Sequence, residues 1–393
     1  MYLEARHLSV TEPMFTAKWD GRVYEEPSML RLFLGGKGYS TLRAGWKWLK
    51  HERRAHVPVP LRQKFEMWRR GFFAESAVLY DLPRNNPRDY VNDFQYHRMI
   101  GRVNEWDGLY NQKLALRAFL LAMGFRQAPT VAYLLEGRIF AEPFTERARY
   151  ITPAECLELL RVEGARYVVK PEDGRRGEGL FLLECRNGQL LRRRGRETQP
   201  LDLGAFLQQA AAGPPRATLI ERWVEQGLFW ERLFPESANT LRVLTLWHPD
   251  DLTPFIARAV QRIGTVDTVP TDNWSGGGIS VPVDLATGRL GVGRLHPLKS
   301  GRQDQRVTHH PDTGTPIEGA VIPGWSRVAD AVLRAAGGLP FNRMGGWDVL
   351  VDRDGEPVIV EGNANSDVNL LQVHGGLLAD SAASRFYRAF GAA

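Results

Sequence analysis

The amino-acid sequence predicts an α+β protein that is built mainly from antiparallel hairpins. Short apolar runs bounded by Gly, Pro, Asn and Asp follow one another after residue 124, which is typical of strands joined by turns. The regular strand–helix alternation of a doubly wound parallel sheet is missing. Upstream, apolar residues recur with helical spacing in residues 39–54 and 61–80. These three observations favour an α+β fold with a helical N-terminal region.

The N-terminal region is expected to consist of helices that pack on the remainder of the chain. Pro58 and Pro60 separate its two helical segments, and residues 81–90 are expected to form a loop. Residues 111–123 then predict an amphipathic helix, which the following Gly124 ends.

The expected strands follow this helix. Residues 167–170 form a short apolar run that ends in Lys170, and residues 179–191 predict a hairpin that turns at Asn187 and Gly188. The later elements are expected to be strands at residues 218–224, 239–246, 255–263, 279–283 and 289–292, and a helix at 325–336.

Bulk composition is that of an ordinary globular protein of two or three domains. The chain has 393 residues, of which 43% are hydrophobic and 24% charged. No run of about 18 or more apolar residues predicts a membrane span, and the start lacks the apolar core of a signal peptide. Cys156 and Cys185 form neither a disulfide framework nor a metal knuckle, so we expect two buried, inert thiols. The sequence therefore predicts a cytoplasmic protein with no membrane partner.

The net charge of +6, from 51 Lys and Arg against 45 Asp and Glu, favours anionic partners. A nucleoside triphosphate satisfies such a charge as well as a nucleic acid does. No aromatic-interleaved basic stripe, helix-turn-helix or zinc-finger spacing occurs, so no nucleic-acid partner is expected. For the densest basic run, residues 192–196, a solvated loop is favoured over a substrate-binding role.

The sequence DVLVDRDGEPVIVEGN, residues 348–363, predicts a hairpin that turns at Asp354-Gly355. Glu361 and Asn363 are two apart on the second strand and share a face, and Asp348 heads the partner strand. Two carboxylates and an amide carbonyl at the strand ends make an all-oxygen site of the kind that Mg²⁺ accepts. The alternative is an ordinary exposed hairpin with polar ends.

A lysine at a strand end stands directly before a glycine-rich segment. Lys170 precedes Gly174, Gly177 and Gly179. Glycines let backbone N–H groups approach an anion, and the lysine ammonium is a point charge for phosphate. The segment is neither a Walker A loop nor a dinucleotide fingerprint, and plain turn chemistry explains it equally well.

Three further features add to this pattern. Glu221 lies at the edge of an expected strand with an apolar tail, which suits an adenine ring. Arg242 lies inside an otherwise apolar strand and needs an anionic partner, either a ligand or a structural acid. A donor-rich loop precedes the next strand and contains Asp272, Asn273, Gly276, Gly277 and Gly278.

The order of these features resembles the ATP-grasp superfamily, and the closer resemblance is to its sugar-transfer-associated family. The motifs that carry it are NTLRVLTL, DNWSGGGISVPVDLATG, HPDTGTPIEGAVIPGW and GGWDVLVDRDG…VIVEGNAN. It covers roughly residues 85–380. Five separated features occur in the expected order: a lysine-bearing helix, Lys170 with its glycine-rich segment, the Glu221 strand edge, the Arg242 strand and the 348–363 hairpin. The resemblance implies two α+β subdomains that sandwich ATP. The implied boundaries are a helical region at 1–105, an N-terminal part with a lid at 106–222, and a C-terminal subdomain with the metal site at 223–393.

The resemblance also implies roles for individual residues. Lys113 and Lys170 would contact ATP phosphates or the adenine edge, and Arg242 would lie against the γ-phosphate. The mobile lid would run from Gly174 to Gly179. The remaining implied residues are Glu221, Arg222, Trp223 and Val224 for adenine, Glu225 for the ribose, and Asp348, Glu361 and Asn363 for Mg²⁺.

Two departures from the family pattern concern the acceptor side. Residues 192–216 form a charged insert, and no proline follows Asn363 closely. Asp272, Asn273 and Gly276–Gly278 are our candidates for the acceptor pocket. No base is assigned, because we expect the available histidines to be structural or on the surface; they are His296, His309, His310 and His374.

The activity that the resemblance implies is ATP-dependent ligation of a small carboxylate to a nucleophile. An amine is the favoured nucleophile, with a thiol or hydroxyl as alternatives, and the reaction would pass through an acylphosphate and release ADP and phosphate. Arg242 and Lys170 would be the catalytic cations. A homodimer is possible. The alternatives are an ATP-grasp kinase acting on a hydroxyl and a non-catalytic ATP-binding module.

Overall fold

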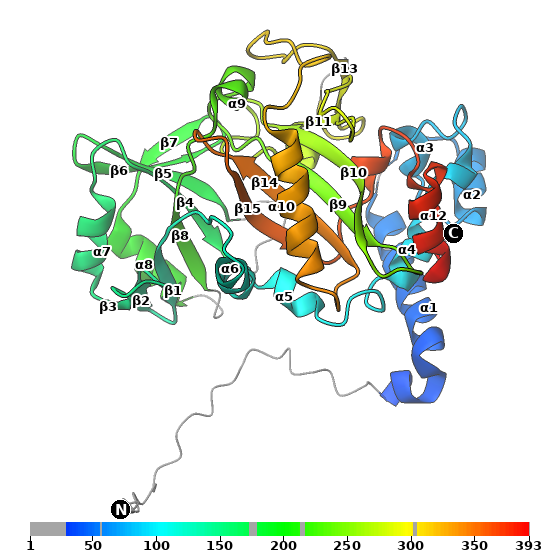
Figure 1. Cartoon of the computed structure of the whole chain (residues 1–393), viewed down its shortest axis with the longest axis horizontal. Coiled ribbons are helices and arrows are strands. Elements are labelled where there is room, and N and C mark those ends of the chain that lie inside the picture. The colour runs from blue at the N-terminus through cyan, green and yellow to red at the C-terminus, as the bar shows by residue number, and fades with distance from the viewer. Residues whose placement is uncertain (1–28, 56, 173–178, 213–216, 302–304, 393) are drawn as a thin grey trace, which may run out of the picture. The chain divides into compact units, whose positions relative to one another are not determined.

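The computed structural model describes residues 29–55, 57–172, 179–212, 217–301 and 305–392. Two of the predicted lid glycines, Gly174 and Gly177, lie outside these described residues. The chain divides into two compact units, residues 1–39 and 40–393, and every predicted site residue belongs to the second (Figure 1).

The helices flank two sheets. In chain order they are α1 (Met29–Arg54), α2 (Leu61–Arg69), α3 (Ser76–Leu79), α4 (Asp93–Met99), α5 (Asp107–Asn111), α6 (Lys113–Ala122), α7 (Pro153–Leu160), α8 (Leu203–Ala212), α9 (Leu228–Leu233), α10 (Trp325–Gly337), α11 (Asn369–Gln372) and α12 (Ser381–Ala389). Single 3-10 turns are η1 (Pro87–Asp89), η2 (Trp274–Gly276) and η3 (Leu377–Ala379).

The first sheet has eight antiparallel strands in the order β3-β2-β1-β8-β4-β5-β6-β7. Their bounds are β1 (Thr130–Leu135), β2 (Arg138–Ala141), β3 (Arg149–Ile151), β4 (Arg166–Pro171), β5 (Phe181–Arg186), β6 (Gln189–Arg194), β7 (Glu197–Pro200) and β8 (Thr218–Arg222). The predicted turn between β5 and β6 is confirmed, because Asn187 and Gly188 both have positive φ, at 51° and 69°. Helices α7 and α8 pack against this sheet.

The second sheet has seven antiparallel strands in the order β13-β12-β11-β10-β9-β14-β15. Their bounds are β9 (Leu241–Trp247), β10 (Pro254–Ile263), β11 (Ile279–Pro282), β12 (Gly293–Leu295), β13 (Arg306–Val307), β14 (Met344–Val351) and β15 (Pro357–Asn363). The β9–β10 and β14–β15 hairpins occur where the sequence predicts them. The predicted α+β class is therefore confirmed.

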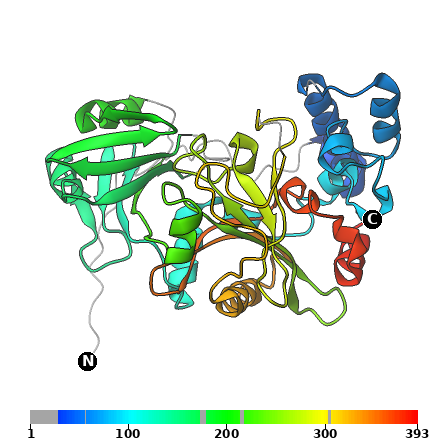
Figure 2. The same ribbon diagram turned by 90° about the horizontal axis from the view of Figure 1, so that it is seen from above.

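Side-chain alternation divides the second sheet into two covered faces. On β9, Leu241 and Val243 pack into the core under α10, whereas Leu244 and Leu246 pack into the core shared with the N-terminal helices and α12. Figures 1 and 2 show α10 on one face of this sheet, away from the N-terminal helices and α12. Because Arg242 alternates with Leu241 and Val243, its side chain lies on the face toward the N-terminal helices.

Three details of the secondary structure differ from the prediction. Residues 61–80 do not form one helix. Helix α2 ends at Arg69, and Gly71 then adopts a positive φ of 78°, which a continuing helix does not allow. The basic run 192–196 is not a solvated loop but the end of β6 and the turn into β7, with Arg193 paired to Glu236 at 2.6 Å. Residues 289–292 make only isolated bridges, and the strand there begins at Gly293.

The N-terminal helical region is tied to the segment that follows β15. The hydroxyl of Tyr96 donates to the carbonyl of Ser366, and the Asn104 amide donates to the carbonyl of Ala364 at 3.1 Å. The hydroxyl of Tyr80 donates to the side chain of Asn369. Helices from the start of the chain therefore hold the residues that come directly after Asn363.

A buried carboxyl within this region makes its stability sensitive to pH. Asp93 is 6% exposed, and one of its oxygens accepts from the N–H of Phe73 and from the hydroxyl of Ser76. Burial raises the pKa of Asp93 from its ordinary 3.8 to about 7. Between these two values the folded state binds the proton more tightly than the unfolded chain, so the stability contributed by Asp93 falls as the pH rises.

We expect Asp93→Asn to keep both hydrogen bonds, because both end on one oxygen, and to remove this pH dependence. The measurement is urea unfolding of both proteins at about pH 5 and about pH 8. The variant should gain free energy of unfolding relative to wild type on going to the higher pH. An unchanged difference at the two pH values would contradict the assignment.

Candidate functional site

The first part of the site lies where β4 and β8 run side by side. The Lys170 ammonium is 2.8 Å from one oxygen of Glu221, and the Arg117 guanidinium is 2.6 Å from the other. Burial raises the pKa of Glu221, but Lys170 and Arg117 outweigh it and hold that pKa below its ordinary value. Glu221 is therefore an ionised, buried side chain that holds two cations between the central strands of the sheet.

At the end of β8, some backbone N–H groups are hydrogen-bonded and others are not. The N–H groups of Arg222 and Trp223 donate to the carbonyls of Pro129 and Arg166, both at 2.9 Å. Within the described part of the chain, the N–H of Val224 meets no backbone carbonyl. The Glu225 carboxylate pairs with Arg166, which also lies over the Trp223 ring. The predicted adenine edge thus offers backbone groups at Val224, while its two acids are already paired.

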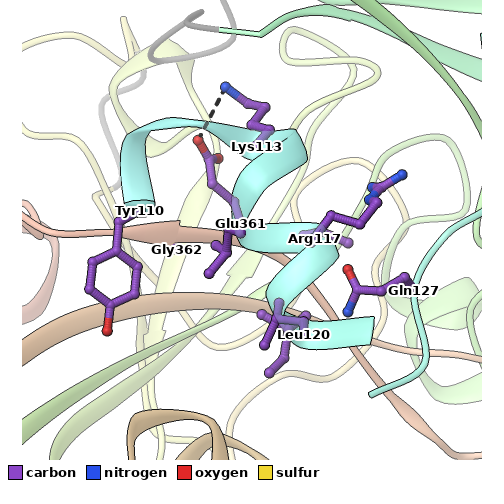
Figure 3. Close-up of a pocket in the computed structure, with 10 residues that line it drawn as sticks. Tyr110, Lys113, Arg117, Leu120, Gln127, Glu361 and Gly362 are labelled. Carbon is purple, nitrogen blue, oxygen red and sulfur yellow. Dashed lines mark ion pairs between the residues drawn. The ribbon is translucent and has the colours of Figure 1, made fainter. Parts of the chain in front are cut away.

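Lys113, the first residue of α6, connects the two sheets. Its ammonium donates to the carbonyl of Glu172 at 2.8 Å, directly after β4, and lies 3.6 Å from Glu361 of β15. Figure 3 shows Lys113 and Glu361 pointing toward each other, and both line a small hollow between α6 and β15. This hollow has room for a volume of about 10 Å³, far below the roughly 300–1,000 Å³ of ligand sites, so we do not assign the nucleotide to it.

A buried chain of ion pairs lies on the neighbouring strands. Arg242 makes two hydrogen bonds to Asp348, at 2.5 and 2.9 Å, and Arg262 approaches the same carboxylate at 3.2 Å. The other side of Arg262 is 2.6 Å from Asp272. Burial raises the pKa of Asp348, but Arg242 and Arg262 hold it below its ordinary value. The anionic partner that Arg242 requires is therefore a structural acid in this structure.

The position of Asp348 differs from the prediction. It does not head its strand but lies in the middle of β14, between β9 and β15, and is 4% exposed. The strand begins earlier, through Gly345 and Gly346, where a Cβ would lie 2.9 Å from the Tyr110 hydroxyl and 2.4 Å from the Ser366 hydroxyl. These glycines permit close packing within a strand. In a sequence they cannot be told from the glycines of a loop, so the start of β14 is not predicted.

Glu361 and Asn363 fit a metal ion better than Asp348 does. A β-bulge beside the Asp348–Glu361 pair shifts the register of β15, a device often found next to active sites. The Glu361 side chain is 35% exposed. The Asn363 NH₂ group donates to the carbonyl of Gly346, and among the described residues no donor meets its oxygen, which suits it as a ligand. Both oxygens of Asp348 already accept from arginine. Among the described residues, no three His, Cys, Asp or Glu side chains gather as a metal site.

The predicted acceptor loop is closed on itself. The N–H groups of Gly276, Gly277 and Gly278 donate to the carbonyls of Asn273 and Trp274 within η2. Asp272 is 3% exposed and accepts from the N–H and hydroxyl of Thr240, besides its pair with Arg262. In this structure these N–H groups and the Asp272 carboxylate are therefore not available to a ligand. Asp272 instead positions Arg262.

Two histidines near this loop have lowered pKa values. Burial lowers the pKa of His296 to about 4 and that of His374 to about 3. The His296 ring packs on Trp274 at 4.5 Å, and one nitrogen of His374 lies 2.9 Å from the Ser280 hydroxyl. His310 is buried and stacks on Phe234, whereas His309 is exposed. Both His296 and His374 are therefore neutral at pH 7.

Sequence reasoning missed three residues that the structure brings into the site. Arg262 lies inside the apolar strand β10, so the argument that selected Arg242 applies to it equally. Arg117 follows Lys113 by one helical turn in an otherwise apolar helix, which places both cations on one face. Glu172 gave no such signal; its carboxylate accepts from the N–H of Leu114, the second residue of α6.

Two antiparallel sheets, between which Lys113 reaches from Glu172 beside the first to Glu361 of the second, are the architecture of an ATP-grasp protein. The model of the family described as "Sugar-transfer associated ATP-grasp" matches residues 144–384, and the chain belongs to this family. No curated protein matches the chain.

Solved structures resemble the chain at low identity. D-cycloserine synthetase is 16% identical with a TM-score of 0.36, over 72% of this chain and 69% of that one. L-amino acid ligase from Bacillus licheniformis is 11% identical with a TM-score of 0.33, over 69% of this chain and 42% of that one. Biotin carboxylase from Campylobacter jejuni is 9% identical with a TM-score of 0.40, over 73% of this chain and 47% of that one. The chain thus spans less than half the length of the last two.

Proposed function

We propose that the protein is an ADP-forming ligase that couples ATP cleavage to the joining of a small carboxylate and an amine. The observation that carries the proposal is the Lys113–Glu361 approach of 3.6 Å. It brings a cation of the first subdomain against the partly exposed acid of the hairpin in the second. In phosphoryl transfer the protein contributes mainly by positioning the reactants and by neutralising charge.

In the proposed binding mode, the backbone at Val224 contacts the adenine edge, and Lys113 and Lys170 contact phosphate oxygens. Lys170 is free to do so without leaving Glu221, because an ammonium has three donors. Gly179 (φ 74°), the described end of the lid, packs so closely on Pro171 that a Cβ would lie 2.9 Å from its ring. Glu225 is a weaker candidate for the ribose, because Arg166 already binds it.

Glu361 and Asn363 are the residues that would hold Mg²⁺, with the ATP phosphates completing its ligands. Bound there, the ion would neutralise phosphate charge. Arg242 and Arg262 share the Asp348 carboxylate, and Arg262 also pairs with Asp272. We assign Asp348 to the positioning of the two arginines, and Arg242 to the charge beside the γ-phosphate.

The first chemical step needs no base, since a carboxylate is ionised at pH 7. Its oxygen attacks the γ-phosphorus, the bond to the β-phosphate oxygen breaks, and ADP leaves. In the second step the amine attacks the acyl carbon of the acylphosphate, phosphate leaves, and the amine proton passes to solvent or to a base that we do not assign.

Lys113→Met is expected to raise KM for ATP by about 10-fold or more, because a charged hydrogen bond is worth about 1.5–3 kcal/mol. Fold stability should change little, since Lys113 is the first residue of α6. Steady-state ADP release checks this, with Arg126→Met as control, an exposed arginine that pairs with Asp352 and Asp354. An unchanged KM would remove Lys113 from the site.

The test of the proposed reaction is ADP release in a screen of carboxylic acids and amines, with hydroxylamine as a trap. A ligase converts its acylphosphate into a hydroxamate, whereas a kinase leaves a stable phosphorylated product. ATP-dependent stabilisation with no ADP release from any pair would instead favour a non-catalytic module.

A further inference from the structure

Helices α1 and α2 carry apolar side chains on their outer faces. The exposed apolar residues of each helix are spaced by four and three, so they form one row along it. The row on α1 is Leu42 (55% exposed), Trp46 (67%) and Leu49 (41%), and the row on α2 is Leu61 (79%), Phe65 (66%) and Trp68 (36%).

The two rows belong to neighbouring helices. The Trp68 ring meets Trp48 of α1 edge-on at 5.8 Å between ring centroids, and its indole N–H donates to Glu52 at 2.9 Å. Opposite the rows, Ala44 of α1 and Met67 of α2 are buried. Each helix is therefore apolar on its packed side and again on its outer side, which core packing does not require.

Basic residues gather around these rows. Residues 40–70 contain nine Lys and Arg and only two Glu, a net charge of +7 against +6 for the whole chain. The positive excess of the protein is thus concentrated here. A cation directly follows the third apolar residue of each row, Lys50 on α1 and Arg69 on α2, and Arg62 follows the first residue of the row on α2. On a helix this spacing puts them beside the row. Arg43, at the matching position on α1, instead donates to the carbonyl of Ile100 at 2.7 Å.

We propose that this face of α1 and α2 docks the protein on an anionic lipid surface. Exposed Trp, Phe and Leu flanked by Lys and Arg are the features of helices that lie in a bilayer interface. Each basic residue near an anionic leaflet contributes to binding, and aromatic rings favour the headgroup level. A partner protein with an apolar groove would not need the concentrated charge, and a second copy of this face would bring equal charges together.

This proposal revises the expectation of no membrane partner. That expectation rested on the lack of a long apolar run, and no helix among the described residues is long and apolar enough to cross a membrane. Interfacial binding has no such requirement.

The test is co-sedimentation of the full chain with vesicles of phosphatidylcholine, alone or with about 30 mol% phosphatidylserine. We expect binding to the anionic vesicles only, weakened at least 10-fold between about 0.1 and about 0.5 M NaCl. The pair Trp46→Ala and Phe65→Ala should weaken it by about 10-fold or more. Tyr150→Ala, at an aromatic residue that is also 67% exposed but lies on β3, should not. Thermal unfolding midpoints of the variants confirm folding.

A labelled thiol tests the face itself. Cys156 and Cys185 are buried, so Trp46→Cys provides an exposed thiol for an environment-sensitive dye, with Tyr150→Cys as control. A blue shift on anionic vesicles at position 46 alone supports the proposal. Absence of vesicle binding, equal binding to neutral vesicles, binding without a shift at position 46, or a dimer that Trp46→Ala dissociates in place of vesicle binding would each overturn it.

Discussion

Replacing Glu361 with alanine is expected to lower ADP formation on the order of 10³-fold or more, while the protein stays folded. The loss follows from removing the one carboxylate of the proposed metal site that remains partly exposed and is not held by arginine. Among the described residues, the ion pair that this change breaks is the 3.6 Å approach to Lys113, so the unfolding midpoint should move little.

The matched control is Glu356→Ala, on the same hairpin. Glu356 is a half-exposed carboxylate whose partner, Arg327, is also exposed, so its loss should alter neither activity nor stability appreciably. ADP release and thermal unfolding of the two variants decide the matter. Wild-type turnover in Glu361→Ala would remove this residue from the site.

Replacing Asp348 with alanine is expected to destabilise the fold itself, by about 3–5 kcal/mol. The change leaves Arg242 and Arg262 in the buried middle of the sheet without their shared carboxylate. From the sequence, with Asp348 at a strand end, this variant is expected to lose ATP turnover with little loss of fold. Because Asp348 lies in the middle of β14, the structure instead predicts a large loss of stability.

Denaturant unfolding of Asp348→Ala provides the measurement. Asp354→Ala is the control, since Asp354 pairs with Arg126 at the surface and should contribute less than about 1 kcal/mol. A loss as small as that of the control would mean that the two arginines do not depend on Asp348 for their stability.

Local signals in the sequence were sufficient for the hairpins. The Asn187-Gly188 turn and the β9–β10 and β14–β15 pairs are each set by turn residues and alternation over a few positions. The strand order was not accessible in this way. Strand β8 inserts between β1 and β4, and such a pairing depends on contacts between distant residues, which no local pattern contains.

The same limit applies to the site. The sequence predicts that a charged residue in an apolar strand, such as Arg242, needs a partner of opposite charge. It does not predict which residue that partner is. The sequence predicts Asp348 as a metal ligand because it heads the strand that pairs with the strand of Glu361, whereas in the structure Asp348 accepts from Arg242 of the neighbouring strand β9. Gly345 and Gly346 hid the start of β14, because glycines that allow close packing resemble glycines of a loop.

The central claim is that the two sheets hold a magnesium–nucleotide between them, with Glu361 as a metal ligand. Isothermal titration of the full chain with ATP, with and without Mg²⁺, tests it most directly. Binding that requires Mg²⁺ in the wild type and loses this requirement in Glu361→Ala is the predicted result. No heat with Mg²⁺-ATP, or the same magnesium dependence in both proteins, would contradict the account.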